Sequence, residues 1–104
     1  MRKRLIICST CAGPGEALAR TLEGAVPGWE VARHGCLSVC AEPVGLAVQA
    51  EGRATYVFAG LTEADAGDVA AFAALHDAAP DGWIEDARPA GRLRFCLKAR
   101  VPGL

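Results

Sequence analysis

The chain has 104 residues, a formal net charge of −1 and a hydrophobic content of 52%. These values are typical of one small globular domain, and they exclude a disordered chain, a collagen-like chain, a coiled coil and a two-domain enzyme. The near-neutral charge argues against a nucleic-acid-binding protein, because such proteins hold phosphate groups with a basic surface. A chain of this length buries only about two thirds of the surface that it exposes when unfolded, so we expect an additional source of stability.

The first residues do not have the pattern of a targeting or membrane segment. A basic stretch at 2–4 precedes an apolar run at 5–7, which is shorter than the ~7 to 15 apolar residues of a signal peptide. The longest stretch without a charged residue, 5–15, is shorter than the ~20 residues that span a membrane. We therefore expect a cytoplasmic protein without membrane contact. In a reducing cytoplasm, clustered cysteines indicate metal or redox chemistry more often than disulfides.

The first third of the chain predicts a strand, a helix and a second strand. Apolar residues over 4–8 predict a short buried strand, and glycines and a proline end it. A helix is expected over 16–26, with an apolar face made of Leu18, Leu22 and Ala25. Alternating apolar and polar residues over 29–33 predict the second strand. In such a β-α-β unit the two strands are parallel.

The middle of the chain predicts a hairpin followed by a helix. Strand-like runs over 44–50 and 54–60 flank a short glycine-containing connection. Thr62 is the expected N-cap of the next helix, because Asp65 follows three positions later. The predicted buried face of this helix consists of Val69, Phe72, Ala73 and His76, and the turn that ends it of Pro80, Asp81 and Gly82. The predicted order is β-α-β-β-β-α, an α/β fold with a mixed sheet.

Residues 80–104 are expected to form an irregular tail that contains one short strand over 92–97. Charge is segregated along the chain, since 61–86 has seven acidic and no basic residues whereas 87–104 has five basic and no acidic ones. The simpler interpretation is that the basic tail pairs with the acidic segment. The functional interpretation is a docking surface for a basic partner.

Four of the five cysteines form two close pairs, each at the end of a predicted strand. Cys8 and Cys11 follow the first strand, and Cys36 and Cys40 follow the second. Because the β-α-β order makes these strands neighbours, we expect the four sulfur atoms to converge at one edge of the domain. Four thiolates are a complete ligand set for an iron–sulfur cluster or for a structural zinc ion. A third interpretation is a thioredoxin-like dithiol at Cys8 and Cys11, which leaves the second pair without a role.

The remaining polar candidates have simpler explanations. Cys96, between two apolar residues, is expected to be a core thiol, and His34 an exposed loop residue that could also tune a metal site. Ser9, Thr10 and Ser38 are placed to donate hydrogen bonds to cluster sulfurs. The glycines form no phosphate-binding loop, and the histidines lack recognisable acidic and nucleophilic partners. We therefore do not expect an enzyme.

Several short motifs are shared with a known group of proteins. They comprise Cys8, Thr10, Cys11, Cys36, Leu37, Cys40, Pro43, Tyr56, Phe58, Leu61, Pro80, Asp81, Gly82, Arg88, Pro89, Arg100 and Pro102. The order of elements, the cysteine pair that ends the first strand, and the segment with Cys36, Leu37, Cys40 and Pro43 resemble the thioredoxin-like [2Fe–2S] ferredoxins, whose fold is shared with the iron–sulfur small subunit of respiratory complex I. The other motifs resemble one family of that group. Within that group the chain is most similar to a family of small bacterial proteins described as predicted metal-binding. The first two ligands are more widely separated in the better-known ferredoxins.

The resemblance implies one thioredoxin-like domain over 1–104, with a core over about 4–79, that binds a [2Fe–2S] cluster. Carried over residue by residue, it makes the ligands Cys8, Cys11, Cys36 and Cys40. It also implies a homodimer that acts with a protein redox partner as a one-electron carrier or redox accessory. Members are often encoded beside cobalamin-biosynthesis genes, which suggests metal or corrinoid metabolism. Zinc bound by the same four cysteines, or a thiol–disulfide oxidoreductase, are the alternatives.

Overall fold

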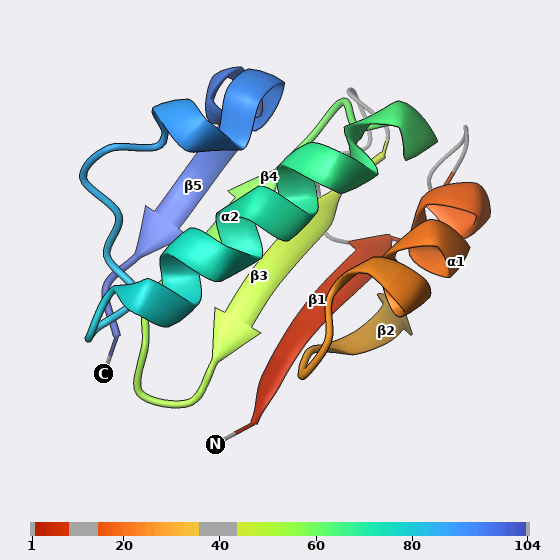
Figure 1. Ribbon diagram of the computed structural model, residues 1–104. Coiled ribbons are helices and arrows are strands. Elements are labelled where there is room, and N and C mark those ends of the chain that lie inside the picture. The colour runs from red at the N-terminus through yellow and green to blue at the C-terminus, as the bar shows by residue number, and fades with distance from the viewer. Residues whose placement is uncertain (1, 9–14, 36–43, 104) are drawn as a thin grey trace.

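The computed structural model describes residues 2–8, 15–35 and 44–103 (Figure 1). In chain order the elements are β1 (Lys3–Cys8), α1 (Gly15–Ala25), β2 (Glu30–His34), β3 (Leu46–Ala50), β4 (Thr55–Phe58), the 3₁₀ turn η1 (Glu63–Asp65), α2 (Ala66–Ala78), the 3₁₀ segment η2 (Arg88–Phe95) and β5 (Leu97–Val101). None of the helices within these ranges has the length and apolar character needed to cross a membrane.

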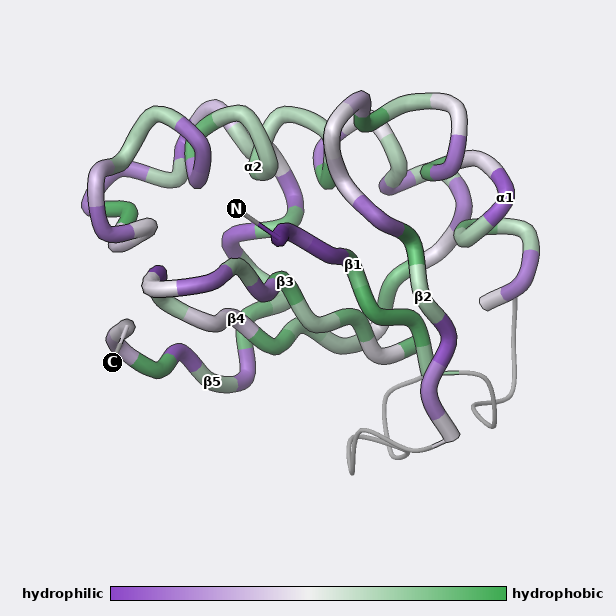
Figure 2. The backbone as a smooth tube through the Cα atoms, turned by 90° about the horizontal axis from the view of Figure 1, so that it is seen from below, coloured by the Kyte–Doolittle hydropathy of each residue, from purple (hydrophilic) through white to green (hydrophobic). Residues whose placement is uncertain are grey.

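The strands form one mixed sheet in the order β2-β1-β3-β4-β5. β1 and β2 are parallel, and each of the other neighbouring pairs is antiparallel. The predicted β-α-β-β-β-α order is therefore confirmed, and the topology resembles that of the thioredoxin-like ferredoxins. Both α-helices cover the same face of the sheet (Figures 1 and 2).

The hydrophobic core lies between the sheet and the helices. Alternate residues of the strands face this layer, so that Leu5 and Ile7 of β1 are 0% and 1% exposed. Phe72 of α2 meets Tyr56 and Phe58 of β4 edge to face, with ring centroids 4.9 and 5.0 Å apart. Such pairs contribute about 0.5–1.5 kcal/mol each beyond the area that they bury. The aromatic cluster therefore fixes α2 over the middle of the sheet.

The first helix differs from the prediction at its C-terminal end. Leu18 and Leu22 are buried, as predicted, but Ala25 is exposed. Ala19 is buried instead, because it lies three residues before Leu22 on the same side of the helix. The helix ends at Ala25 and Val26 is buried directly after it. At this end of α1, the contact with the core is therefore made by Val26, the residue that follows the helix.

The second helix packs as predicted, but the predicted N-cap Thr62 caps the preceding turn η1, and Asp65 is the N-cap of α2 itself. The Thr62 backbone N–H donates to the Asp65 carboxylate at 2.8 Å, and the turn η1 leads into α2. The buried face consists of Val69, Phe72, Ala73 and His76. At the C-terminal end, the Arg53 guanidinium donates to the carbonyl oxygens of His76 and Ala79, at 2.7 and 3.0 Å. This arginine satisfies carbonyls that the end of a helix leaves without intrahelical partners.

The chain after α2 departs from the prediction in one place. The strand predicted over 92–97 is wrong, because residues up to Phe95 belong to η2 and the strand β5 begins at Leu97. Arg92 explains the difference. Its backbone N–H donates to the Asp68 carboxylate at 3.2 Å and its guanidinium to Asp65 at 2.7 Å. These bonds direct this part of the backbone toward α2 and away from the sheet.

The segregated charges pair within the protein, which is the simpler of the two predictions. Arg92 of the basic tail pairs with Asp65 of the acidic segment, and Arg88 pairs with Asp86 at 2.8 Å. The Asp86 carboxylate accepts hydrogen bonds from the Arg88 side chain and backbone, which lower its pKa to about 2. At these two pairs the acidic and basic segments neutralise each other.

Candidate functional site

Of the four predicted ligands, Cys8 lies within the described residues, and it ends β1. Its register partner across the parallel pair is His34, the last residue of β2. The Cys8 side chain is 1% exposed, and its thiol contacts the carbonyl oxygen of Gly35 at a sulfur–oxygen distance of 3.7 Å. The two strand ends that were predicted to precede the cysteine pairs therefore lie side by side.

The residues that border the two cysteine-containing segments all lie close to Cys8. Gly15, the first residue of α1, is so near that a Cβ atom there would stand 3.3 Å from the Cys8 carbonyl oxygen and 3.4 Å from Val44. The Cys8 backbone N–H donates to the Gly45 carbonyl at 3.0 Å. Together with the Gly35 contact, these distances bring the borders of both segments to the end of β1.

The other predicted site residues lie outside the described residues. These are Cys11, Cys36 and Cys40 among the predicted ligands, and Ser9, Thr10 and Ser38 among the predicted hydrogen-bond donors. Over residues 2–8, 15–35 and 44–103, no three His, Cys, Asp or Glu side chains form a group that could hold a metal ion. The four-cysteine ligand set therefore stays a prediction.

Cys96 occupies the environment expected from the sequence, and His34 is exposed as expected but lies in β2 rather than in a loop. His34 is exposed at the end of β2. Cys96 is 7% exposed within the hydrophobic core, and its sulfur lies 3.6 Å from the Arg92 carbonyl oxygen. Cys96 is thus confirmed as a core thiol.

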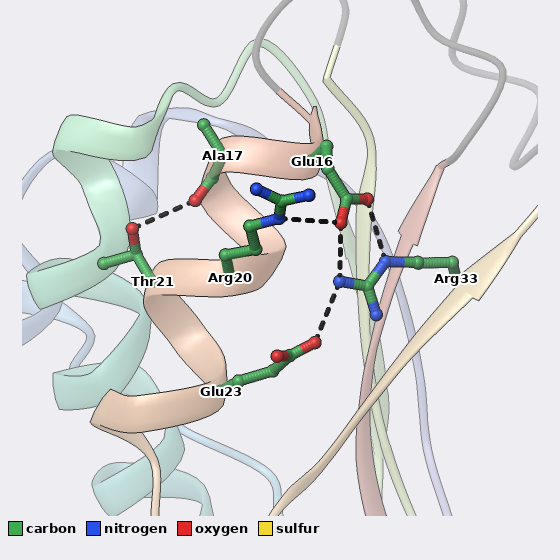
Figure 3. Close-up of polar contacts among 6 residues, drawn as sticks. All are labelled: Glu16, Ala17, Arg20, Thr21, Glu23 and Arg33. Carbon is green, nitrogen blue, oxygen red and sulfur yellow. Dashed lines mark hydrogen bonds and ion pairs between the residues drawn. The ribbon is translucent and has the colours of Figure 1, made fainter.

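A charged cluster holds α1 against β2 beside the candidate site (Figure 3). The Arg33 guanidinium donates to both carboxylate oxygens of Glu16, at 2.9 and 3.0 Å, and to Glu23 at 2.8 Å. Arg20, one turn along the helix, also donates to Glu16 at 3.3 Å. The hydrogen bonds that Arg33 donates lower the pKa of Glu16, and the same bonds to Glu16 and Glu23 raise the pKa of Arg33.

This cluster positions two borders of the candidate site. Glu16 directly follows Gly15, and Arg33 directly precedes His34, so the cluster connects the start of α1 to the end of β2. The sequence analysis missed it. Glu16 and Glu23 are seven residues apart, which places them on one face of a helix two turns apart, and this spacing is the signal that would have indicated a shared basic partner.

Comparison with known proteins relates the chain to one family. Residues 5–103 match the model of a family described as a protein of unknown function, DUF1636. The chain belongs to the DUF1636 family. The match includes β1 to β5, both cysteine-containing segments and η2, so DUF1636 accounts for nearly the whole chain. No curated protein and no solved structure gives a significant match.

Proposed function

We propose that this DUF1636 protein binds one [2Fe–2S] cluster through Cys8, Cys11, Cys36 and Cys40 and acts as a one-electron carrier or redox accessory. The observation that carries the proposal is the position of Cys8 at the end of β1. Gly15, Gly35 and Gly45 surround it, so the borders of both cysteine-containing segments meet there. Two pairs of thiolates from two segments match the two irons of the cluster.

The environment of Cys8 fits a buried soft-metal ligand. The Cys8 side chain is 1% exposed, and its thiol donates to the Gly35 carbonyl oxygen at a sulfur–oxygen distance of 3.7 Å. Binding of iron would replace this proton, since metal ligands must be deprotonated. When bound, the cluster supplies one-electron transfer, and the chain sets its potential through hydrogen bonds and solvent exposure around the sulfurs.

The same burial argues against the dithiol alternative. In a thiol–disulfide oxidoreductase of the thioredoxin type, the first cysteine of the pair is the nucleophile and is exposed to its substrate. Cys8 holds that position here, and its side chain is almost fully buried. Zinc bound by four cysteines remains the second candidate, because a soft thiolate set suits zinc as well as iron.

The test is the visible absorption spectrum of the full chain, purified anaerobically as the wild type and as three variants. We expect the wild type to be coloured and to bleach with dithionite. We expect Cys8→Ser and Cys40→Ser to lose the colour, whereas Cys96→Ser, a buried cysteine outside the ligand set, keeps it. A colourless wild type with stoichiometric zinc would support the zinc site. A colourless and metal-free wild type whose disulfide exchange survives Cys40→Ser would support the dithiol.

The resemblance also leads us to propose a cytoplasmic homodimer that works with a protein redox partner in metal or cobalamin-related metabolism. This proposal rests on the resemblance, since DUF1636 carries no assigned function. Sedimentation equilibrium of the purified chain would measure the mass in solution. A single species of 10.8 kDa at micromolar concentration would contradict the dimer.

A further inference from the structure

A pocket lies at the opposite end of β1 from Cys8. It has a volume of about 430 Å³ and lies where the start of β1 meets the β3–β4 hairpin and the residues after β5. Arg4, which lines the pocket, precedes Cys8 by four residues on β1, which is about 13 Å at ~3.3 Å per residue. The volume falls within the range of small-ligand pockets, about 300–1,000 Å³. The pocket is therefore separate from the candidate cysteine site.

Arg4 and Gln49 form the centre of this pocket. They are register partners on β1 and β3, and they lie on the face of the sheet away from the helices, because the adjacent Leu5 is fully buried against the helices. Nε and Nη2 of Arg4 both donate to Oε1 of Gln49, at 3.1 and 3.0 Å. This fork directs the amide oxygen of Gln49 toward Arg4 and leaves its NH₂ group to donate elsewhere.

Arg4 is half-buried, and it carries a positive charge that no ion pair among the described residues neutralises. The other two arginines of the lining differ in this respect. Arg2 pairs with Glu30 at 3.3 Å, and Arg53 donates to carbonyl oxygens at the end of α2. A half-buried guanidinium with only a neutral amide partner is a ready binding group for an anion.

The rest of the lining limits which anions fit. Thr55 adds a hydroxyl on β4, and Glu51 adds one carboxylate at the hairpin turn, so the lining keeps a net positive charge. Gly103 closes one wall, since a Cβ atom there would stand 2.9 Å from the Gly52 carbonyl oxygen. Glu51 would repel a large polyanion, whereas an anion of a few oxygens bound at Arg4 and Gln49 avoids it.

We propose that this pocket binds a small oxyanion, a phosphate or carboxylate group, through the guanidinium of Arg4, the amide of Gln49 and the hydroxyl of Thr55. Nη1 of Arg4 and the second N–H of its Nη2, which do not donate to Gln49, match two oxygens of such a group, and the amide and hydroxyl donate to a third. The proposal does not depend on the cysteine site, because none of these residues borders it.

The test is the unfolding temperature and the isothermal titration heat of the full chain with inorganic phosphate and, separately, with acetate at low ionic strength. We expect saturable binding of at least one of them, and a rise in the unfolding temperature, because a ligand that binds only the native state stabilises it. Phosphate binding alone would assign a phosphate group, and acetate binding alone a carboxylate.

Matched variants locate the binding. We expect Arg4→Gln to weaken it about tenfold or more and Thr55→Val to weaken it less, because the loss of a charge-assisted bond exceeds that of a neutral one. Arg20→Gln, an exposed arginine on α1, should bind as the wild type does. Absence of saturable binding by either anion, or equal binding by Arg4→Gln and the wild type, would overturn the proposal.

Discussion

Cys8 and His34 occupy the same register position at the ends of the parallel strands β1 and β2. Because parallel strands end at the same edge of a sheet, the segments that follow these two residues leave the sheet together. The cysteines of both segments follow within a few residues. This relationship connects the spacing of the cysteines in the sequence to a common site, and it is the physical basis of the proposed function.

The close approach of Gly15 to Cys8 predicts a specific sensitivity at the start of α1. Gly15→Val would place a branched side chain within 3.3 Å of the Cys8 carbonyl and 3.4 Å of Val44. We expect it to destabilise the protein by about 1–3 kcal/mol, as overpacking commonly does, and to lower the amount of iron bound. Urea unfolding and iron analysis would measure both effects.

Gly24 is the matched control on the same helix. A Cβ atom at Gly24 meets nothing within 4 Å, and the residue is exposed. We expect Gly24→Ala to stabilise the protein by about 0.5–1 kcal/mol, because alanine has the higher helix propensity. Equal effects of the two substitutions would show that Gly15 does not position the candidate site.

Buried His76 predicts a loss of stability in mildly acidic solution. The ring is fully buried between Trp29, Tyr56 and Phe72, and its Nε2 lies 2.8 Å from the Ala54 carbonyl oxygen. Within the described part of the chain, its Nδ1 has no hydrogen-bond partner. Desolvation lowers the pKa of His76. The unfolded chain therefore binds a proton more readily than the native one, so stability is complete above the unfolded pKa of about 6.5 and falls as the pH drops below it.

The charges around His76 do not reverse this direction. The hydrogen bond to the Ala54 carbonyl and the charge of Asp77 each raise the pKa by less than burial lowers it, and Arg53 and Lys3 lower it further. We expect the unfolding free energy to fall between pH 7 and pH 5, and His76→Leu to reduce that fall although it is less stable overall. Urea unfolding at several pH values would measure this. An identical pH dependence in both proteins would assign the effect to other groups.

The pairing of Arg92 with Asp65 predicts a measurable contribution from a single ion pair. Asp65 is 5% exposed and also accepts the Thr62 N–H, so loss of Arg92 would leave a buried carboxylate without its cation. Because the Arg92 side chain is itself 54% exposed, we expect Arg92→Gln to cost only about 1–2 kcal/mol.

The Arg88–Asp86 pair provides the comparison. Both of its side chains are exposed, at 77% and 55%, and exposed pairs contribute little to stability. We expect Arg88→Gln to change the unfolding free energy by less than about 0.5 kcal/mol. If chemical denaturation gave equal losses for the two variants, burial of Asp65 would not be the cause.

Substitutions at two glycines with similar φ angles distinguish the cost of backbone strain from the cost of steric crowding. Gly82 and Gly52 have φ values of 71° and 69°. A Cβ atom at Gly82 would stand 2.7 Å from Nε2 of His76, whereas one at Gly52 meets nothing within 4 Å. We expect Gly52→Ala to cost about 1–2 kcal/mol from backbone strain alone, and Gly82→Ala to cost clearly more. Thermal unfolding of both variants would test this difference.

The sequence predicted the fold well where hydrophobic periodicity and caps agree. The buried face of α2, from Val69 to His76, was predicted residue by residue, because the spacing of apolar residues indicates it. The pairing of Thr62 with Asp65 was predicted as well, but it caps the turn η1 that leads into α2. The strand β5 was placed too early. Its start depends on hydrogen bonds from Arg92 to residues about 25 positions earlier, and local patterns do not contain such long-range contacts.

The candidate site was predicted in its outline. Paired cysteines and the β-α-β order suffice to bring two strand ends together, which the Cys8–His34 register confirms. The charged cluster around Arg33 and the Arg4 pocket were missed, since each joins residues from different elements. Only the three-dimensional arrangement identifies which charges are compensated and which are not.

The central claim is that the four paired cysteines hold a [2Fe–2S] cluster. The most direct measurement is the content of iron, acid-labile sulfide and zinc in the anaerobically purified full chain. We expect about two iron and two sulfide per chain, with little zinc. About one zinc per chain, with neither iron nor sulfide, would contradict the claim.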